Sequence, residues 1–444
     1  MAGIAGINKP DQNKLIDKML DKISYRGNAK KIIFSSKYST MGIITNGIQS
    51  KDVDSFIKEN CVKDYFGEEH LAEAKEIDGT LQLKRDVLGV APLYYGYNVE
   101  GTLCFASEFK AMLEVTKDIK ELLPGTILID NKPVQYFKVK ADHSLNYEQN
   151  IIAQQLFNLL DDKIKKSVSD NKACCWLSGG LDSSIMASLL SQYVDKLYTF
   201  SAGVKGAQDL EYSKIMSDYL KSIHHEIIVT PEEMIKILPD VIYHLETFDA
   251  LLIRSSITNF IVSKEASNYV EHVFSGEGGD ELFGGYDYLK KIPLKKLNDE
   301  LIDITYRLHN TALQRVDRSA AAFGTTASVI FANPDVVEFA FKISPQLKIM
   351  NGKEKWILRL SMKDKLPKEI FDRAKAKFWE GAGVGEILAE YANKKISDSD
   401  FQKERKLKNG WELNSKEELL YYRIFKEHFG DLDNLDWMGK TKII

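Results

Sequence analysis

The sequence predicts two domains of different class: an antiparallel α+β domain, then an α/β domain with a doubly wound parallel sheet and a mostly helical C-terminal part. In the first 140 residues, short β-prone apolar runs alternate with turn signals. From about residue 150 the pattern becomes strand, helix, strand, which is typical of parallel sheets. Beyond residue 290 the pattern is mostly helical. A length of 444 residues agrees with two or three domains of ~150 residues each.

The first domain is expected to contain one amphipathic helix, roughly 15–23, whose apolar residues share a single face. Its expected strands are 31–34, 81–83, 93–95, 103–105 and 126–129. A polar stretch at 138–150 follows and is the predicted linker. The domain limits are therefore expected at 1–140 and 150–444.

The second domain opens with an apolar run at 173–177, as expected for a parallel strand that is covered on both faces. Further strands are expected at 197–204, 226–229 and 272–274, with a helix after each of the first three strands. In doubly wound sheets, ligands bind outside the carboxyl ends of the strands. The loops after residues 177 and 274 are therefore the places to look for a site.

Composition excludes several classes of protein. Lys and Arg total 60 and Asp and Glu total 64, a net charge of −4, which argues against bulk electrostatic binding to nucleic acid or to a membrane. The four cysteines form no CxxC pair, so a disulfide scaffold or a zinc site has no support. The N-terminus has no basic leader and no apolar tract reaches ~18 residues. We therefore expect a cytoplasmic protein.

The first loop that carries chemistry is Ser178-Gly179-Gly180-Leu181-Asp182-Ser183-Ser184, between a strand and a helix. The two glycines let the backbone turn tightly and present its N–H groups, and the helix directs its positive N-terminus to the same point. This pattern predicts a phosphate-binding loop. It is not a Walker loop, because no Gly-Lys-Ser/Thr follows.

The second loop begins Ser275-Gly276-Glu277-Gly278-Gly279-Asp280-Glu281. Three acidic residues so close together are costly unless a cation or an ammonium group shares the site. If the two strands are neighbours, the two loops lie side by side. Asp182 and Asp280 would then hold Mg²⁺ on a triphosphate, because Mg²⁺ takes a few carboxylates together with phosphate oxygens.

These loops carry a family resemblance. The first resembles the pyrophosphate loop of the N-type ATP pyrophosphatases, which cleave ATP to AMP and pyrophosphate, and the two together resemble the asparagine synthetase family. Further segments match that family in order over roughly residues 150–430. They are Asp209 to Tyr212, His224 to Glu226, Glu246 to Asp249, Ile253 to Ser256, Arg315 to Arg318, Glu354 to Arg359, Arg373 to Lys375 and Phe378 to Gly383.

The resemblance implies roles for individual residues. Lys375 would balance the charge on the departing pyrophosphate, and Glu277 would handle protons when an amine attacks. In β-lactam synthetases, which share this domain, the position of Glu277 is typically Tyr, so Glu277 favours the amide-forming branch. The implied substrate-binding residues are Arg254, Glu246, Asp249 and Glu380. The implied ATP-binding residues are Leu177, Ser178, Gly179, Gly180, Asp182, Ser183, Ser184, Val204, Gly276 and Lys375.

The first domain resembles the glutaminase half of the same family, which implies an antiparallel β-sandwich of the Ntn-amidotransferase type. Several functional elements are missing. The N-terminal Cys nucleophile is replaced by Ala2, and a His-Arg-Gly-Pro-Asp element reads Tyr25-Arg26-Gly27-Asn28-Ala29. The Asn-Gly-Glu loop is not recognisable after Asn46-Gly47. We therefore expect a degenerate glutaminase domain kept for structure.

A second departure lies in the C-terminal domain. Thr326, Ser328 and Asn333 stand where the family has Glu, Arg and Asp. This exchange is either a neutral change in packing or a change in a wall of the substrate pocket. The sequence favours neither interpretation.

The function expected from these observations is an ATP-dependent ligase that adenylates a carboxylate and couples it to an amine or free ammonia without hydrolysing glutamine, in specialised-metabolite biosynthesis. ATP and Mg²⁺ are the expected cofactors. The expected partners are a small-molecule carboxylate and an amine or ammonia, with no nucleic acid and no membrane, and a homodimer is left open. The alternatives are ammonia-dependent asparagine synthesis, a β-lactam-synthetase-like cyclase that acts within one molecule, and a catalytically silent binding protein.

Overall fold

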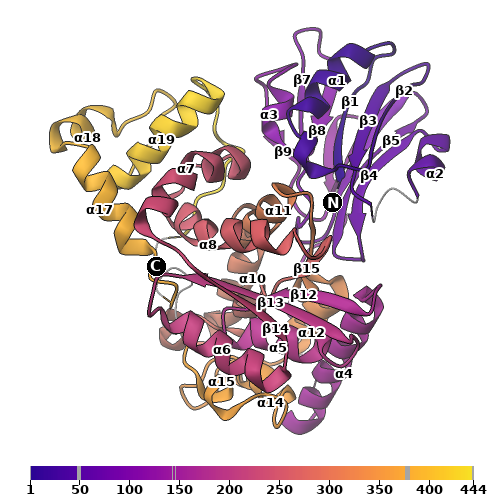
Figure 1. The fold of residues 1–444 in the computed structure, drawn as a ribbon. Helices are drawn as coiled ribbons and strands as arrows, with labels where there is room; N and C mark the ends of the chain where they lie inside the picture. The colour runs from indigo at the N-terminus through magenta and orange to yellow at the C-terminus, as the bar shows by residue number, and fades with distance from the viewer. Residues whose placement is uncertain (1, 48–51, 143, 146, 376–380, 443–444) are drawn as a thin grey trace.

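The N-terminal part is a sandwich of two antiparallel sheets (Figure 1). The computed structural model describes residues 2–47, 52–142, 144–145, 147–375 and 381–442. One sheet has the order β2-β3-β1-β8-β7-β9 and the other the order β11-β10-β6-β5-β4. The strands are β1 (Ala2–Ile7), β2 (Lys30–Ser35), β3 (Thr40–Thr45), β4 (Cys61–Phe66), β5 (His70–Ile77), β6 (Thr80–Arg85), β7 (Tyr94–Tyr97), β8 (Leu103–Ala106), β9 (Lys120–Glu121), β10 (Thr126–Ile129) and β11 (Lys132–Gln135).

The core of this sandwich forms between the two sheets. Ile4 and Ile43 from the first sheet pack in one cluster with Val62, Ala72 and Leu83 from the second. Three short helices accompany the sheets: α1 (Asn13–Asp21), α2 (Val53–Lys58) and α3 (Phe109–Met112). The expected strands are all present, but the sequence analysis missed the central strand β1. Its two glycines interrupt the alternation of apolar and polar residues, and every residue of β1 is buried, so no period of two appears.

The C-terminal part is built on a parallel sheet of order β14-β13-β12-β15-β16. Its strands are β12 (Lys172–Trp176), β13 (Lys196–Gly203), β14 (Ile223–Ile228), β15 (His272–Phe274) and β16 (Thr326–Ser328). The first four were expected. β16 was not, because three residues in a region of mostly helical pattern leave no periodicity to detect.

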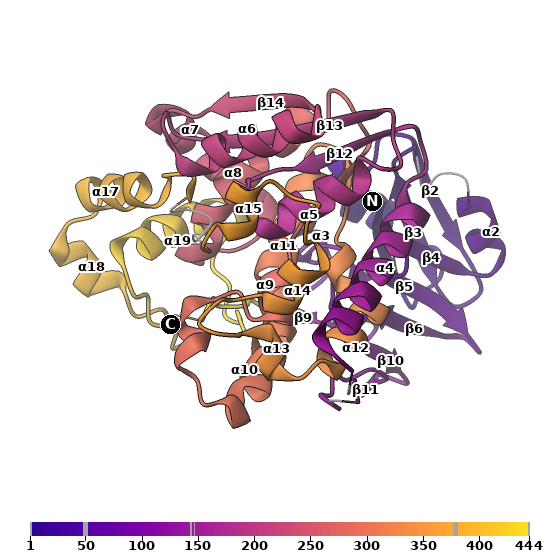
Figure 2. The same cartoon turned by 90° about the horizontal axis from the view of Figure 1, so that it is seen from below.

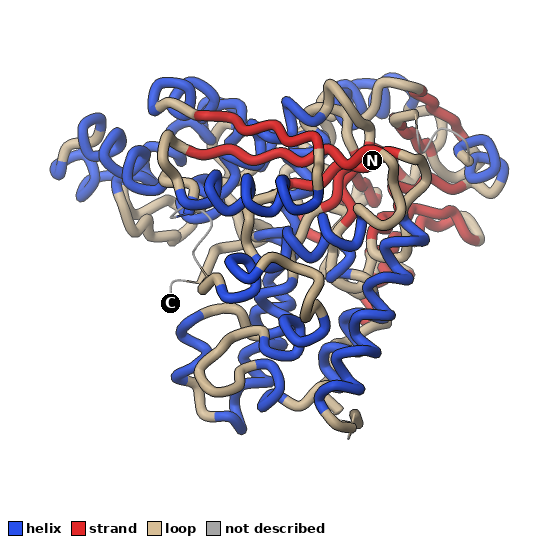
Figure 3. Tube along the Cα trace, turned by 60° about the horizontal axis from the view of Figure 1, so that its bottom comes forward, coloured by secondary structure: helices blue, strands red, loops and turns tan. Residues whose placement is uncertain are grey.

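Helices cover both faces of this sheet, which confirms the doubly wound α/β class (Figures 1 and 2). On one face lie α4 (Gln149–Ser167), α5 (Leu181–Leu190) and α6 (Gln208–Leu220). On the other lie α7 (Pro231–Leu245), α8 (Ala250–Ala266) and α11 (Ala312–Ala321). Figure 3 shows that the strand-rich N-terminal part lies beside this sheet, while helices and loops form the rest of the C-terminal part.

The remaining helices build the helical C-terminal part that the sequence predicts. They are α9 (Gly279–Phe283), α10 (Leu294–Tyr306), α12 (Pro334–Lys342), α13 (Pro345–Lys348), α14 (Trp356–Ser361), α15 (Lys368–Asp372), α17 (Gly385–Lys395), α18 (Asp398–Glu404) and α19 (Lys416–Phe429). Among the described residues of the predicted linker, none belongs to a helix or strand before α4 begins at Gln149, and the domain limits themselves stay a prediction. Among the described residues, none of the helices has the length and apolar character that crossing a bilayer requires.

Candidate active site

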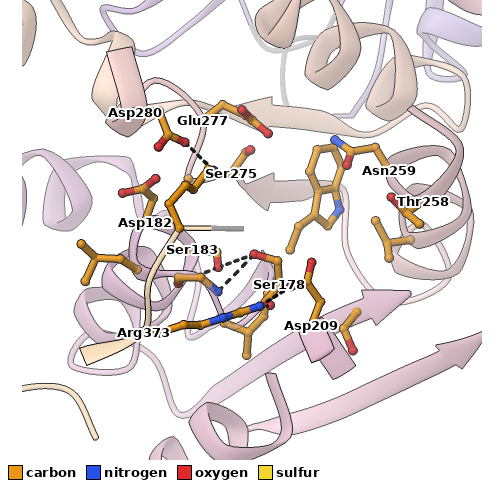
Figure 4. A pocket seen from close by; sticks show the side chains of 18 of the residues that line it. Ser178, Asp182, Ser183, Asp209, Thr258, Asn259, Ser275, Glu277, Asp280 and Arg373 are labelled. Atoms are coloured by element: carbon orange, nitrogen blue, oxygen red, sulfur yellow. Dashed lines mark hydrogen bonds and ion pairs between the residues drawn. The ribbon is translucent and has the colours of Figure 1, made fainter. Parts of the chain in front are cut away.

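A pocket of about 1030 Å³, including space open to solvent, lies at the carboxyl ends of β12, β13 and β15 (Figure 4). β12 and β15 are neighbours in the sheet, with Cys175 paired to Phe274. The loops that follow these two strands therefore meet at one edge of the sheet, as predicted. This edge is where doubly wound folds bind their ligands.

The loop from Ser178 to Ser184, called here the phosphate-type loop, packs so closely that only glycine fits at position 179. Gly179 has a φ of +68°, and a Cβ there would lie 2.4 Å from the backbone N of Ser213. Ser178 Oγ lies 3.1 Å from Ser183 Oγ and accepts a hydrogen bond from the N–H of Gly180. α5 begins directly after this glycine, at Leu181, so the positive end of the helix faces the pocket.

The second loop packs against the first through its own glycines. A Cβ on Gly276 would lie 2.6 Å from the backbone N of Ser183 and 2.7 Å from the carbonyl carbon of Asp182. A Cβ on Gly279 would lie 2.6 Å from the carboxyl carbon of Asp182. The two loops are therefore in direct backbone contact, which brings their carboxylates together.

Two lysines neutralise these carboxylates. Lys355, just before α14, contacts the carboxylate of Asp182, and its Nζ lies 2.7 Å from Asp280 Oδ1. The Nζ of Lys375 donates to Asp280 Oδ2 at 2.6 Å. Burial opposes ionisation of Asp280, but the two ammonium groups outweigh it and hold the pKa of this carboxyl well below its usual value. A side chain on Gly285 would exclude Lys355, because a Cβ there would lie 2.2 Å from Lys355 Cε.

The same carboxylates fit a divalent cation. Asp182 and Asp280 reach one shared ammonium group, and Asp182 Oδ1 is buried without a hydrogen bond. Two carboxylates that share a cation are the protein part of the donor set that Mg²⁺ takes beside phosphate oxygens. These residues can hold Mg²⁺ once Lys355 gives up its place between them.

We therefore expect Lys355→Met to bind a divalent cation more tightly than the unchanged protein does. The ammonium group and the ion compete for the same oxygens, so its removal should strengthen Mn²⁺ binding by roughly tenfold, about 1.4 kcal/mol. The measurement is Mn²⁺ titration by electron paramagnetic resonance without nucleotide. The control is Lys353→Met, because Lys353 pairs with the half-exposed Asp372 instead and should leave Mn²⁺ binding unchanged. Equal or weaker Mn²⁺ binding by Lys355→Met would contradict the shared site.

Glu277 lines the pocket beside Asp280, and its carboxylate is ion-paired with the guanidinium of Arg315 on α11 (Figure 4). Thr258 and Asn259 of α8 line the side of the pocket across from Asp182 and Asp280 (Figure 4). The pocket therefore has a charged end, suited to phosphates, and a mostly neutral end next to one carboxylate.

Most of the residues predicted for ATP binding, metal binding and catalysis line the pocket. These are Leu177, Ser178, Gly180, Asp182, Ser183, Gly276, Glu277, Asp280 and Lys375. Gly179 and Ser184 belong to the same loop and helix but lie beneath the lining, and Val204, just after β13, donates its N–H to the carbonyl oxygen of Ala382.

Three of the four predicted substrate-binding residues do not line this pocket. The guanidinium of Arg254 is paired with Glu417, with Nε donating to Oε1 at 2.8 Å. Glu246 accepts hydrogen bonds from the backbone N–H of Lys110 and from the guanidinium of Arg318. The carboxylate of Asp249 caps α8 and binds Thr441. Partners inside the protein occupy all three side chains. Glu380 lies outside the described residues.

Other pocket residues escaped the sequence analysis. Arg373 donates to Asp209 Oδ1 at 2.5 Å and to the carbonyl oxygen of Ser178 at 3.1 Å, and so ties α6 to the phosphate-type loop. Lys355 and Arg373 both lie in segments that match the family, yet neither received a role. A count of cations would have found Lys355, because the carboxylates of the two loops require more positive charge than Lys375 supplies.

Comparisons with known proteins bear on the whole chain. A sequence profile described as asparagine synthase matches residues 155–307 and 294–440, which is well over half of the chain. The chain belongs to the asparagine synthase family. A second profile, described as a glutamine amidotransferase domain, matches residues 58–140. The two matches agree with an Ntn-type sandwich followed by an ATP pyrophosphatase-type sheet.

Two curated relatives show what share of an asparagine synthetase sequence aligns with this chain. It is 35% identical over 346 residues to asparagine synthetase [glutamine-hydrolyzing] 2 of Oryza sativa subsp. japonica, which covers 71% of this chain and 58% of that protein. It is 34% identical over 369 residues to asparagine synthetase B [glutamine-hydrolyzing] of Escherichia coli (strain K12), which covers 78% of this chain and 67% of that protein. The chain thus spans only about three fifths to two thirds of these relatives. Among solved structures, NMN synthetase from Francisella tularensis aligns with 65% of the chain at 15% identity and a TM-score of 0.30, too low to indicate a shared fold.

The first described residue of the chain is buried and is held by charged side chains. Ala2 is fully buried and its N–H donates to Asp64 Oδ1 at 2.7 Å. The guanidinium of Arg26 lies beside it, completely buried, and donates to the carbonyl oxygen of Ala2 at 2.8 Å. Other acceptors bind the rest of its N–H groups. Residue 2 therefore carries a methyl group and no thiol, and the guanidinium of Arg26 is bonded to protein acceptors.

The second departure from the family lies away from the pocket. Thr326 Oγ1 accepts a hydrogen bond from Asn46 in the N-terminal part, and Ser328 Oγ lies 2.9 Å from His272 Nε2. Asn333 donates to Glu68 and caps α12. None of the three positions lines the pocket. Of the two interpretations that the sequence left open, the structure favours the change in packing.

Proposed function

We propose that this chain is an ATP-dependent, AMP-forming amide ligase that adenylates a carboxylate and couples it to an amine or to free ammonia. The observation that supports this most is the charged end of the pocket. There a glycine-rich loop, a helix N-terminus and two lysines surround a pair of carboxylates. This arrangement suits a triphosphate whose leaving group must be neutralised. The proposal also includes action in the cytoplasm and in specialised-metabolite biosynthesis.

In the proposed first step, a carboxylate oxygen of the acyl substrate attacks the α-phosphorus of ATP, and the bond to the bridging oxygen of pyrophosphate breaks. The N–H groups of the Ser178 loop and the N-terminus of α5 hold the phosphates. Asp182 and Asp280 would hold Mg²⁺, which supplies charge neutralisation on the triphosphate. Lys375 is placed to neutralise the pyrophosphate as it departs.

In the second step, the amine nitrogen attacks the acyl carbon of the adenylate and AMP leaves. The attacking nitrogen must lose a proton, and Glu277 is a carboxylate that lines the pocket. Its ion pair with Arg315 holds the carboxylate in place within the pocket. This step forms one C–N bond and breaks one C–O bond.

The nitrogen donor in this proposal is ammonia or an amine, not glutamine. The methyl group of Ala2 cannot act as a nucleophile, and Arg26 has no donor left for a substrate carboxylate. Ammonia-dependent asparagine formation is the narrower version of the same chemistry, because the curated relatives are asparagine synthetases. A cyclase that joins an amine and a carboxylate of one molecule is the other version.

We expect pyrophosphate release from ATP with one or more members of a panel of carboxylates and amines, and no glutamine hydrolysis above the blank. The panel includes aspartate with ammonium, and mass spectrometry of the products separates the versions. A product that contains the added amine identifies the ligase, and a product that contains added ammonia identifies the asparagine synthetase. A product that has only lost water identifies the cyclase. Glutaminase activity of the chain with Ala2 would overturn the assignment of the nitrogen donor. Failure to bind MgATP in calorimetry would overturn the ligase itself.

A further inference from the structure

The two parts of the chain are joined by a cluster of charged side chains that is closed to solvent. Arg26, Asp64 and Glu108 come from the N-terminal part, and Asp317 and Arg318 come from α11 in the C-terminal part. Each of the five is at most 1% exposed. Buried charges of this kind are costly to desolvate, so every one of them must be paired and hydrogen-bonded.

Arg26 is the centre of this cluster and its hydrogen-bonding capacity is used completely. Arginine has five N–H donors. Nε donates to the carbonyl oxygen of Ala2 at 2.8 Å, and Nη1 donates to Glu108 at 2.7 Å and to Asp317 at 2.9 Å. Nη2 donates to Asp64 and to Asp317, both at 3.0 Å. Asp317 therefore accepts a bidentate pair, the most directional ion pair available to a carboxylate.

The cluster needs no further cation. Asp64, His70 and Asp317 offer ligand atoms within 4.8 Å of one another, a spacing that a metal ion would accept. The guanidinium of Arg26 already occupies the space between the two carboxylates, with hydrogen bonds to both. A metal ion would have to displace a fully bonded arginine. The cluster is therefore better described as a structural joint than as a metal site.

Helix α11 connects this joint to the pocket. Residues 313 to 321 of α11 are all buried, so the helix is held on every side and moves as a unit. Asp317 and Arg318 face the cluster, while Arg315, on the same turn, reaches Glu277 in the pocket. The bidentate pair at Asp317 thus fixes the rotation and height of the helix that presents Arg315.

We propose that Arg26 is a positioning residue for the amide-forming step: through its pair with Asp317 it fixes α11, and through α11 it fixes Arg315 and Glu277. This inference rests on the proposed function for the role of Glu277. The N-terminal part, in which Ala2 stands where the family resemblance implies a Cys nucleophile, then contributes to the reaction by supplying an arginine that orients the other part.

The first test uses amide hydrogen exchange and needs no activity. In the Arg26→Gln variant, the backbone amide hydrogens of α11 should exchange with solvent at least tenfold faster than in the unchanged chain. The matched control is Arg85→Gln. Arg85 is an equally buried arginine of the N-terminal part whose partners are Glu121 and the carbonyl oxygens of residues 89, 91 and 122, none of them on α11. Unchanged protection of α11 in Arg26→Gln would overturn the proposal.

The second test measures the amide formed per AMP released. Arg26→Gln should lower this ratio about tenfold and leave the affinity for MgATP unchanged, because the phosphate-type loop does not depend on α11. In Glu277→Gln, adding Arg26→Gln should have no further effect on the ratio, since both changes act through the same carboxylate. Arg26→Lys should recover only part of the ratio, because lysine cannot form the bidentate pair.

Additive effects in the double variant would show that Arg26 acts on folding alone and would overturn the proposal. An unchanged chain that forms no product with any substrate would count against the proposed function instead, and hydrogen exchange would still decide whether Arg26 holds α11. The two failures are therefore distinguishable.

Discussion

Lys375→Ala is expected to lower the rate of ATP-dependent pyrophosphate release by roughly 10²–10³-fold, the usual cost of removing one group that stabilises developing charge. Lys375 Nζ lies 2.6 Å from Asp280, at the charged end of the pocket where the leaving group is expected. Burial alone would lower the pKa of Lys375, but Asp280 and Asp182 outweigh it and raise that pKa above its usual value. The lysine therefore acts as a fixed charge, not as a proton donor.

The role of Lys375 as a fixed charge determines the expected pH dependence, and a nearby lysine provides the control. Because the pKa of Lys375 is raised above its usual value, loss of its proton should not shape the pH dependence of pyrophosphate release near neutrality. Lys368→Ala is the matched control, since Lys368 is an exposed lysine on α15, seven positions earlier, and should leave the rate unchanged. If Lys375→Ala released pyrophosphate at the rate of the unchanged chain, Lys375 would have no role in neutralising the leaving group.

The edge of the sheet that carries the site was predictable because its signals are local. The loop after β12 and the loop after β15 each contain glycines, acids and a preceding apolar run within about a dozen residues. The rule that ligands bind at the carboxyl ends of parallel strands then brings Asp182 and Asp280 together without further information. The structure places both in one pocket.

The residues that escaped prediction depend on contacts between distant parts of the chain. Lys355 reaches Asp182 across 173 positions of sequence, and Arg26 reaches Asp317 across 291. No periodicity or spacing encodes such pairs. The same limit explains Arg254, for which the family resemblance implied a substrate carboxylate. Its guanidinium is bonded to Glu417, 163 positions later, a partner that no local pattern indicates.

Gly276→Ala is expected to damage the pocket by forcing its two loops apart. The new Cβ would lie 2.6 Å from the backbone N of Ser183 and 2.7 Å from the carbonyl carbon of Asp182. These are backbone atoms of the phosphate-type loop, so they cannot rotate aside as a side chain does. The clash must move one loop away from the other, which separates Asp182 from Asp280 and turns the loop N–H groups away from the phosphates.

The expected result is a loss of MgATP affinity of at least tenfold by calorimetry, with a loss of about 1–3 kcal/mol in the free energy of unfolding, as for overpacking of a dense interior. Gly101→Ala separates the clash from general glycine effects. Gly101 has a φ of +77° and open space around its Cβ position, so alanine there is strained by about 1–2 kcal/mol but meets nothing. It should lose stability and keep its affinity for MgATP. If Gly276→Ala also keeps that affinity, the two loops are not held in contact in solution, and the pairing of Asp182 with Asp280 must arise in another way.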